Sequence, residues 1–194
     1  MQDFWFYIKL GLEHVLDLAA YDHILFLAAL AVPFTFKKWK QVVILATIFT
    51  IAHCTSLAFS VYGIFTVDVG LIEFLIPVTI ALTALFNFST LFKKEHSNNI
   101  YFQSLATAFF GLIHGFGFSN YFKMLMAEEE NKLGPLLGFA TGIELSQVTI
   151  ILLALVVAYV VQNVFKVKQT IFIGVTSILI FLITIPMLID TFPQ

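Results

Sequence analysis

The sequence contains no arginine and one cysteine, and charged residues make up only 11% of its 194 positions. The lone Cys54 excludes an internal disulfide and a metal site built from several thiolates. The ten cations are all lysines and the net charge is −2, so the chain has no basic stripe and we expect no nucleic-acid partner. A soluble domain has about a quarter of its residues charged, and this chain falls far below that level.

Apolar residues make up 60% of the chain, and the mean hydropathy is +0.96. A soluble globule of this size cannot bury so much apolar surface, so we expect a lipid bilayer as the main partner. The pattern predicts a single all-α domain, residues 1–194, that forms a polytopic transmembrane bundle of about seven spans. The apolar runs cover residues 4–20, 21–36, 41–63, 71–92, 100–126, 135–161 and 170–190. Six spans are the alternative, because the first two runs are short and the first could lie at the interface.

The lysines predict the orientation of the bundle. Seven of them fall in alternate loops, whereas the other loops carry only two lysines together with Asp68 and an acidic run at 128–130. Lysine-rich loops face the cytoplasm, so seven spans place the N-terminus inside and the C-terminus outside. We expect a multi-pass protein of the bacterial inner membrane, and a homo-oligomer is compatible with the sequence. The seven lysines are Lys37, Lys38, Lys40, Lys93, Lys94, Lys166 and Lys168.

Histidines and carboxylates recur within these apolar runs, where ionisable groups are costly and usually functional. Counted along the expected spans, they fall at similar depths in the outer half of the bilayer. They are His14, Asp17, Asp22, His23, His53, Glu73, His114 and Glu144. Their similar depth predicts one shared polar site.

Helical spacing strengthens this prediction in two places. Thr50, His53, Ser56 and Ser60 follow one face of a helix, so Ser56 would lie beside His53. Pro77 cannot donate to the carbonyl of Glu73, so a free acceptor stands beside that carboxylate, as in ion-binding broken helices.

The donor types indicate a transition metal, because imidazole suits ions such as Zn²⁺ and Ni²⁺ and carboxylates compensate their charge. Asp17 or Glu144 would fix the tautomer of a ligating histidine. Ser56 and Glu73 remain candidates for the same surroundings or for an ion pathway. The predicted metal ligands are His14, Asp22, His23, His53 and His114.

Several segments resemble the HupE/UreJ family of small bacterial membrane proteins, in matching order over nearly the whole chain. They include Gly11-Leu-Glu-His14, Tyr21-Asp22-His23, Thr50-Ile-Ala-His53, Leu71-Ile-Glu73 and Gly111-Leu-Ile-His114. The likeness is to the shorter branch of the family. It implies nickel or cobalt uptake, with metal capture by His14, Asp22 and His23 and further roles for His53 and His114. Seven residues separate His14 from Asp22, more than in the nickel-associated members.

Three functions follow from these residues. The first is a divalent transition-metal permease or transport component that carries nickel or cobalt. The second is an intramembrane zinc hydrolase acting on lipid-like substrates, with Glu144 or Asp22 as base and Ser56 orienting or attacking the substrate. The third is a scaffold in which polar side chains only link helices.

Overall fold

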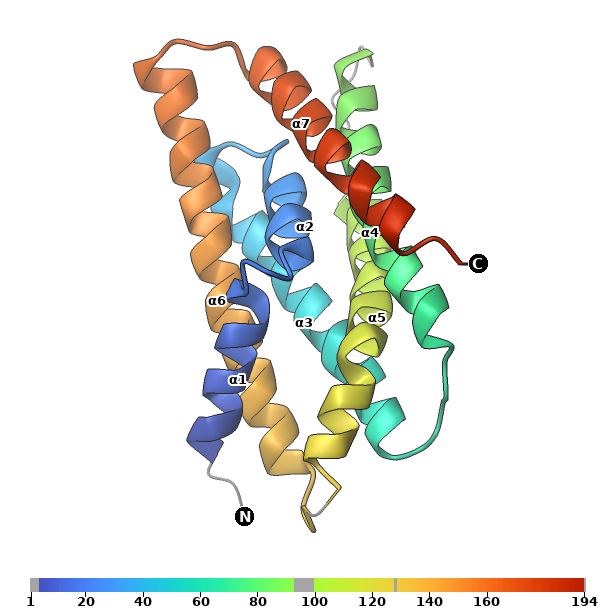
Figure 1. The fold of residues 1–194 in the computed structure, drawn as a ribbon. Coiled ribbons are helices and arrows are strands. Elements are labelled where there is room, and N and C mark those ends of the chain that lie inside the picture. Colours follow the sequence, from blue (N-terminus) through green and yellow to red (C-terminus); the bar gives the residue numbers. More distant parts are fainter. Residues whose placement is uncertain (1–3, 93–99, 128, 194) are drawn as a thin grey trace.

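The computed structural model describes residues 4–92, 100–127 and 129–193, and all regular structure within these ranges is helical. This confirms the all-α class (Figure 1). Short turns η1 (Phe36–Lys38), η2 (Thr90–Phe92) and η3 (Val160–Val164) adjoin α3, α4 and α6. The main helices are α1 (Phe4–Leu16), α2 (Asp22–Ala31), α3 (Trp39–Val61), α4 (Val69–Ser89), α5 (Ile100–Leu125), α6 (Leu133–Tyr159) and α7 (Gln169–Asp190).

Four helical stretches are long and apolar enough to cross a membrane: residues 36–61, 69–92, 133–164 and 169–190. Large apolar side chains face outward from the bundle; Ile51, Leu105 and Leu153 are 63%, 72% and 61% exposed. Such surfaces require contact with lipid, so the chain is a membrane protein. Helix α5 is also long enough, but polar residues along it lower its hydropathy.

Charge distinguishes the two ends of the bundle. The lysine end carries η1 and the connection from η3 to α7, at the top of Figure 1. The acidic end carries the α3–α4 and α5–α6 connections, with Asp68, Glu129 and Glu130. Lys93, Lys94 and Glu128 lie outside the described residues.

Helix α1 starts at the acidic end, which differs from the orientation expected from the sequence. The Tyr7 hydroxyl donates to the Glu129 carboxylate at 3.2 Å. Gly138 packs against Phe4, and Gly142 packs against Ile8, so α1 runs parallel to α6. The expectation that the N-terminus shares the side of the lysine-rich loops was therefore wrong.

Helix lengths explain the difference. Thirteen residues of α1 and ten of α2 span only about 20 Å and 15 Å, and neither matches a hydrocarbon core of about 30 Å. Helix α2 continues toward the lysine end, where the Gln169 side chain donates to the Pro33 carbonyl at 3.4 Å. Together α1 and α2 cross the bundle once, with a break at residues 17–21 near mid-depth (Figure 1). This arrangement corresponds to the six-span alternative.

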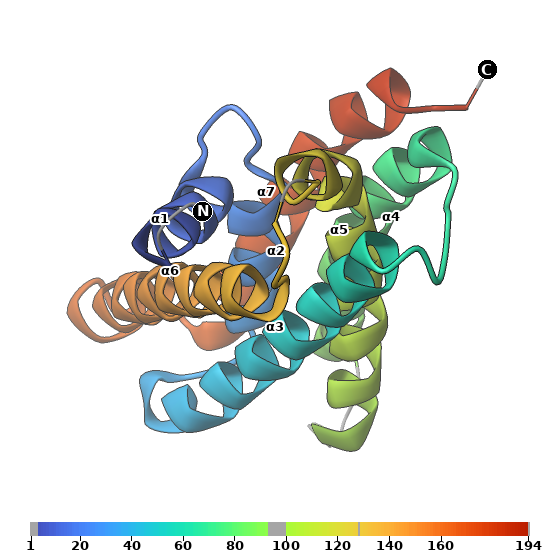
Figure 2. The same cartoon turned by 90° about the horizontal axis from the view of Figure 1, so that it is seen from below.

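Helix α2 occupies the middle of the bundle, as the view along its length shows (Figure 2). His23, Phe26, Leu27 and Leu30 on α2 are buried. Close helix contacts surround it: a Cβ at Gly111 would meet the Phe49 carbonyl of α3 at 2.7 Å. Helix α7 packs mainly on α4, at the edge of the bundle. The break before α2 therefore opens into the centre of the protein.

Candidate metal centre

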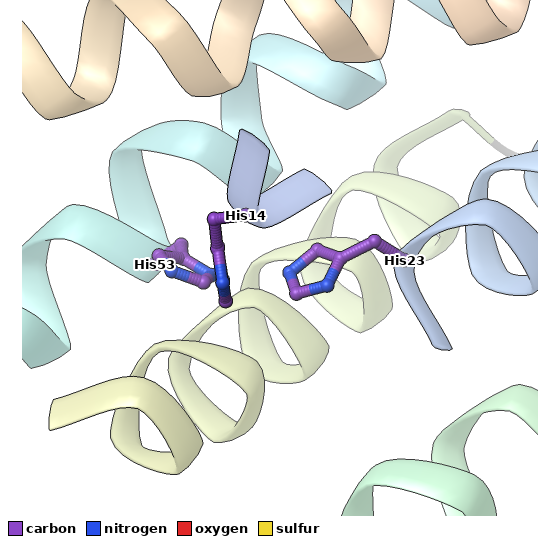
Figure 3. Close-up of side chains that lie close together, drawn as sticks. All are labelled: His14, His23 and His53. Atoms are coloured by element: carbon purple, nitrogen blue, oxygen red, sulfur yellow. The ribbon is translucent and has the colours of Figure 1, made fainter. Parts of the chain in front are cut away.

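Three histidines from three helices face one another at this break. His14 lies near the end of α1, His23 near the start of α2, and His53 in α3 (Figure 3). Their ring centroids are 4.6 Å apart for His14 and His23, 5.7 Å for His14 and His53, and 5.6 Å for His23 and His53. One nitrogen from each ring lies within 4.8 Å of the others. We call these residues the three-histidine group.

A second group shares His23 and consists of Asp22, His23 and His114, with one ligand atom each within 4.8 Å. The Asp22 carboxylate accepts from the His23 backbone N–H at 2.8 Å and lies 3.1 Å from the His23 Nδ1. The His114 ring centroid is 5.3 Å from that of His23. Its Nε2 lies 3.1 Å from the Thr79 hydroxyl of α4. We call Asp22, His23 and His114 the aspartate group.

Five imidazole nitrogens in the two groups are buried and have no hydrogen-bond partner among the described residues. An unsatisfied buried polar atom costs about 1–3 kcal/mol, so five in one place indicate a missing ligand. Opposite nitrogens around a metal at 2.0–2.1 Å are about 4.2 Å apart, only slightly closer than these. The residues present therefore fit a divalent transition metal. The nitrogens are Nε2 of His14, Nε2 of His23, both nitrogens of His53, and Nδ1 of His114.

Phenylalanine rings enclose the histidines on both sides. Toward the lysine end, Phe26 and Phe49 have ring centroids 5.4 Å and 5.2 Å from His114. Toward the acidic end, Phe118 and Phe139 lie 4.0 Å and 5.6 Å from His14. These rings lower the local dielectric constant, which strengthens any interaction between a cation and the ligands.

Two cavities flank the histidines. One of about 650 Å³ reaches His14 and is lined also by Glu13 and Asp17, whose side chains are exposed. The other, of about 450 Å³, lies toward the lysine end and is lined by Phe26 and by residues of α4 and α5, including Asn87. Phe26 contacts His114 and lines the second cavity, so its ring separates that cavity from the aspartate group.

The five residues predicted as metal ligands lie together in the structure, and metal binding by them stays a prediction. Their depth differs from expectation. Eight residues, about 12 Å of helix rise, separate His53 from the end of α3 at Val61. The histidines therefore lie near the middle of the bundle rather than close to the acidic face.

The other predicted residues take separate places. Asp17 lies in the break and accepts from the Ala19 N–H at 2.8 Å. The Ser56 hydroxyl donates to the His53 carbonyl at 2.8 Å. Glu144 accepts hydrogen bonds from two threonines of α3. Glu73 is exposed near the start of α4, and the structure does not bring it to either group.

Sequence reasoning missed Thr79 and the four enclosing phenylalanines. Thr79 is the one hydroxyl bonded to a histidine ring in the described part of the chain. Its signal was a buried polar residue two positions after Pro77 in an apolar run. Among 23 phenylalanines, no pattern distinguishes these four from lipid-facing rings.

Comparison with known proteins gives one match. A family model described as HupE / UreJ protein matches residues 1–190. No curated protein and no solved structure matches the chain. The match covers nearly the whole chain, including both groups of ligands and all seven main helices. The chain therefore belongs to the HupE/UreJ family.

Proposed function

We propose that the protein is a divalent transition-metal permease, or the metal-binding component of one, in the bacterial inner membrane. The observation that carries this proposal is the set of five buried, unpaired imidazole nitrogens at mid-depth in a membrane bundle. A cation bound there would satisfy them. The family resemblance adds nickel and cobalt as the expected cargo.

The cavities support a route through the protein. The cavity beside His14 carries the exposed carboxylates of Glu13 and Asp17, which attract cations from the acidic end. From there a cation would pass from the three-histidine group to the aspartate group while remaining bound to His23. The next space along this direction is the cavity behind Phe26, toward the lysine end. Displacement of the Phe26 ring would open that side.

The donor set supports a borderline cation. Imidazole nitrogens with one carboxylate suit Ni²⁺, Co²⁺ and Zn²⁺, whereas Cu⁺ favours thiolate and thioether ligands. The single thiol, Cys54, belongs to neither group. The aspartate also offsets one charge of a divalent ion in a site with low dielectric constant.

The test is nickel and cobalt accumulation in cells that produce the protein. We expect uptake above that of cells without it, and loss of this uptake in His23→Ala and His53→Ala. His96→Ala supplies a matched substitution at a histidine outside the described residues, and it should keep normal uptake. Uptake that is indifferent to both cluster substitutions, at equal protein levels, would refute the proposal.

A zinc hydrolase is the second candidate, because the three-histidine group adjoins a cavity that could admit substrate. The Ser56 hydroxyl already donates to the His53 carbonyl, so Ser56 is a poor nucleophile here. Purified zinc-loaded protein would hydrolyse lipid esters in this case. Turnover that disappears in His53→Ala would favour hydrolysis over transport.

A further inference from the structure

A second polar cluster lies between α3 and α6, apart from the two metal-ligand groups. The Glu144 carboxylate accepts one hydrogen bond on each oxygen, from the Thr47 hydroxyl at 2.6 Å and from the Thr50 hydroxyl at 2.6 Å. Thr50 and Thr47 lie one and two helical turns from His53 toward the lysine end. Glu144 is therefore the next ionisable group along α3 beyond the histidines in that direction.

Both threonines have a second acceptor within reach. The Thr47 hydroxyl lies 3.1 Å from the Val43 carbonyl, and the Thr50 hydroxyl lies 3.3 Å from Oε1 of Gln147. A hydroxyl donates one hydrogen and accepts others. When Glu144 is charged, each threonine donates to it. When Glu144 is protonated, its O–H donates to Thr47 or Thr50, and that threonine turns its own hydrogen to Val43 or Gln147.

This network satisfies the Glu144 carboxyl in either protonation state, which a purely structural hydrogen bond does not require. In the described part of the chain, no lysine or histidine nitrogen lies within 4.0 Å of this carboxylate. Gln147 is fully buried, and its Nε2 has no partner among the described residues. A half-buried carboxylate without a cation is costly in a membrane, so binding of a positive charge is favoured.

The titratable neighbours come from the helices packed on α6. Cys54 of α3 is the group that interacts with Glu144 electrostatically. On α1, Lys9 and Glu13 form an exposed ion pair with each other at 3.5 Å. The remaining ones are Tyr7 and His14 on α1, Asp22 and His23 on α2, His53 on α3, and Lys37 and Lys38 on η1.

We propose that Glu144 is a proton-exchanging site that couples proton movement to metal transport. The O–H bond forms on Glu144 when the histidines are empty, and the proton leaves to water when a metal binds, because two positive charges along one stretch of α3 repel each other. Metal and proton then oppose each other's binding by the same factor. The coupling rests on the proposed function, whereas proton exchange at Glu144 does not.

The first experiment tests the proton site on metal-free protein. Infrared difference spectra between acidic and alkaline buffer should contain the C=O band of a carboxyl group shielded from water. This band should disappear in Glu144→Gln, persist in Glu13→Gln, and shift in frequency in Thr50→Val, which removes one hydrogen bond. A spectrum unchanged by Glu144→Gln in folded protein would overturn the proposal.

The second experiment tests the coupling. Calorimetric titration of Ni²⁺ in buffers with different ionisation enthalpies gives the number of protons released per metal bound. Ligating histidines also release protons, so the comparison is between variants. We expect fewer protons released by Glu144→Gln than by the unsubstituted protein or Glu13→Gln. Equal release overturns the coupling. If no variant binds Ni²⁺, the metal function and the coupling fall together, and the infrared result alone decides the proton site.

Discussion

His14 and His23 face each other edge to face across the break between α1 and α2, with ring centroids 4.6 Å apart. A continuous helix would place them about 13.5 Å apart along its axis. The break turns two sequence neighbours into partners and admits them to the centre of the bundle, where His53 and His114 meet them. The interrupted span is thus what builds the candidate site.

His23 is the ligand common to both groups, so its removal should have the largest effect on metal binding. We expect His23→Ala to lower Ni²⁺ affinity by more than about 100-fold. His114→Ala should cost less, since it leaves the three-histidine group intact. Calorimetry on purified protein measures both affinities, and circular dichroism checks the fold. A greater loss in His114→Ala than in His23→Ala would contradict the shared role of His23.

Asp22 orients His23 through contacts to its ring and backbone. Asp22→Asn should weaken metal binding by about 10–100-fold, the usual cost of losing a carboxylate that supports a ligating histidine. Asp17→Asn is the matched control, because Asp17 is exposed and bonds only to its own loop in the described contacts. Equal affinities of the two variants would show that Asp22 has no such role.

Gly115 allows α5 to approach α3 at the level of His53. A Cβ there would overlap the Ser56 hydroxyl and the His53 carbonyl, whereas a Cβ at Gly134 meets nothing within 4 Å. Gly115→Ala should destabilise the protein by about 1–3 kcal/mol and weaken metal binding. Gly134→Ala should leave both unchanged. Thermal unfolding in detergent compares the two, and equal melting temperatures would argue against the close approach.

The direction of α1 predicts which residues share a side of the membrane. In a Cys54→Ser background, Trp5→Cys and Asn131→Cys should react with an impermeant thiol reagent from the same side. Lys168→Cys should react from the other, because it lies at the lysine end. Labelling of Trp5→Cys together with Lys168→Cys would restore the N-terminus to the lysine side.

Acid should weaken metal binding. A protonated imidazole has no lone pair for a metal, and four histidines contribute to the two groups. Affinity for Ni²⁺ should therefore fall as pH decreases and rise as it increases, until the histidines are all neutral. Calorimetry over a pH series measures this, and an affinity independent of pH would indicate ligands other than histidine.

The sequence was sufficient for the helices and for the meeting of the ligands. Apolar runs predicted all seven main helices, since only helices satisfy the backbone in lipid. The rarity of ionisable residues made His14, His23, His53 and His114 stand out. Their costs within an apolar run are large enough that a shared location was the simplest reading.

The sequence was insufficient where the answer depended on packing. Counting lysines in loops did not reveal that α1 stops halfway, because residues 4–20 are apolar beyond the end of the helix at Leu16. The Gly138 and Gly142 contacts, which set α1 parallel to α6, appear only in three dimensions. Glu73 looked equivalent to Glu144 by depth alone, yet only Glu144 meets hydroxyl donors.

The sharing of His23 also limits stoichiometry. One imidazole nitrogen of His23 faces Asp22, and the other is unpaired. Two divalent ions held at once would have to bridge this ring as an imidazolate and would repel each other across it. Each chain should consequently hold a single ion at saturation, so a measured ratio of one would reflect alternation between overlapping seats rather than an idle half of the centre.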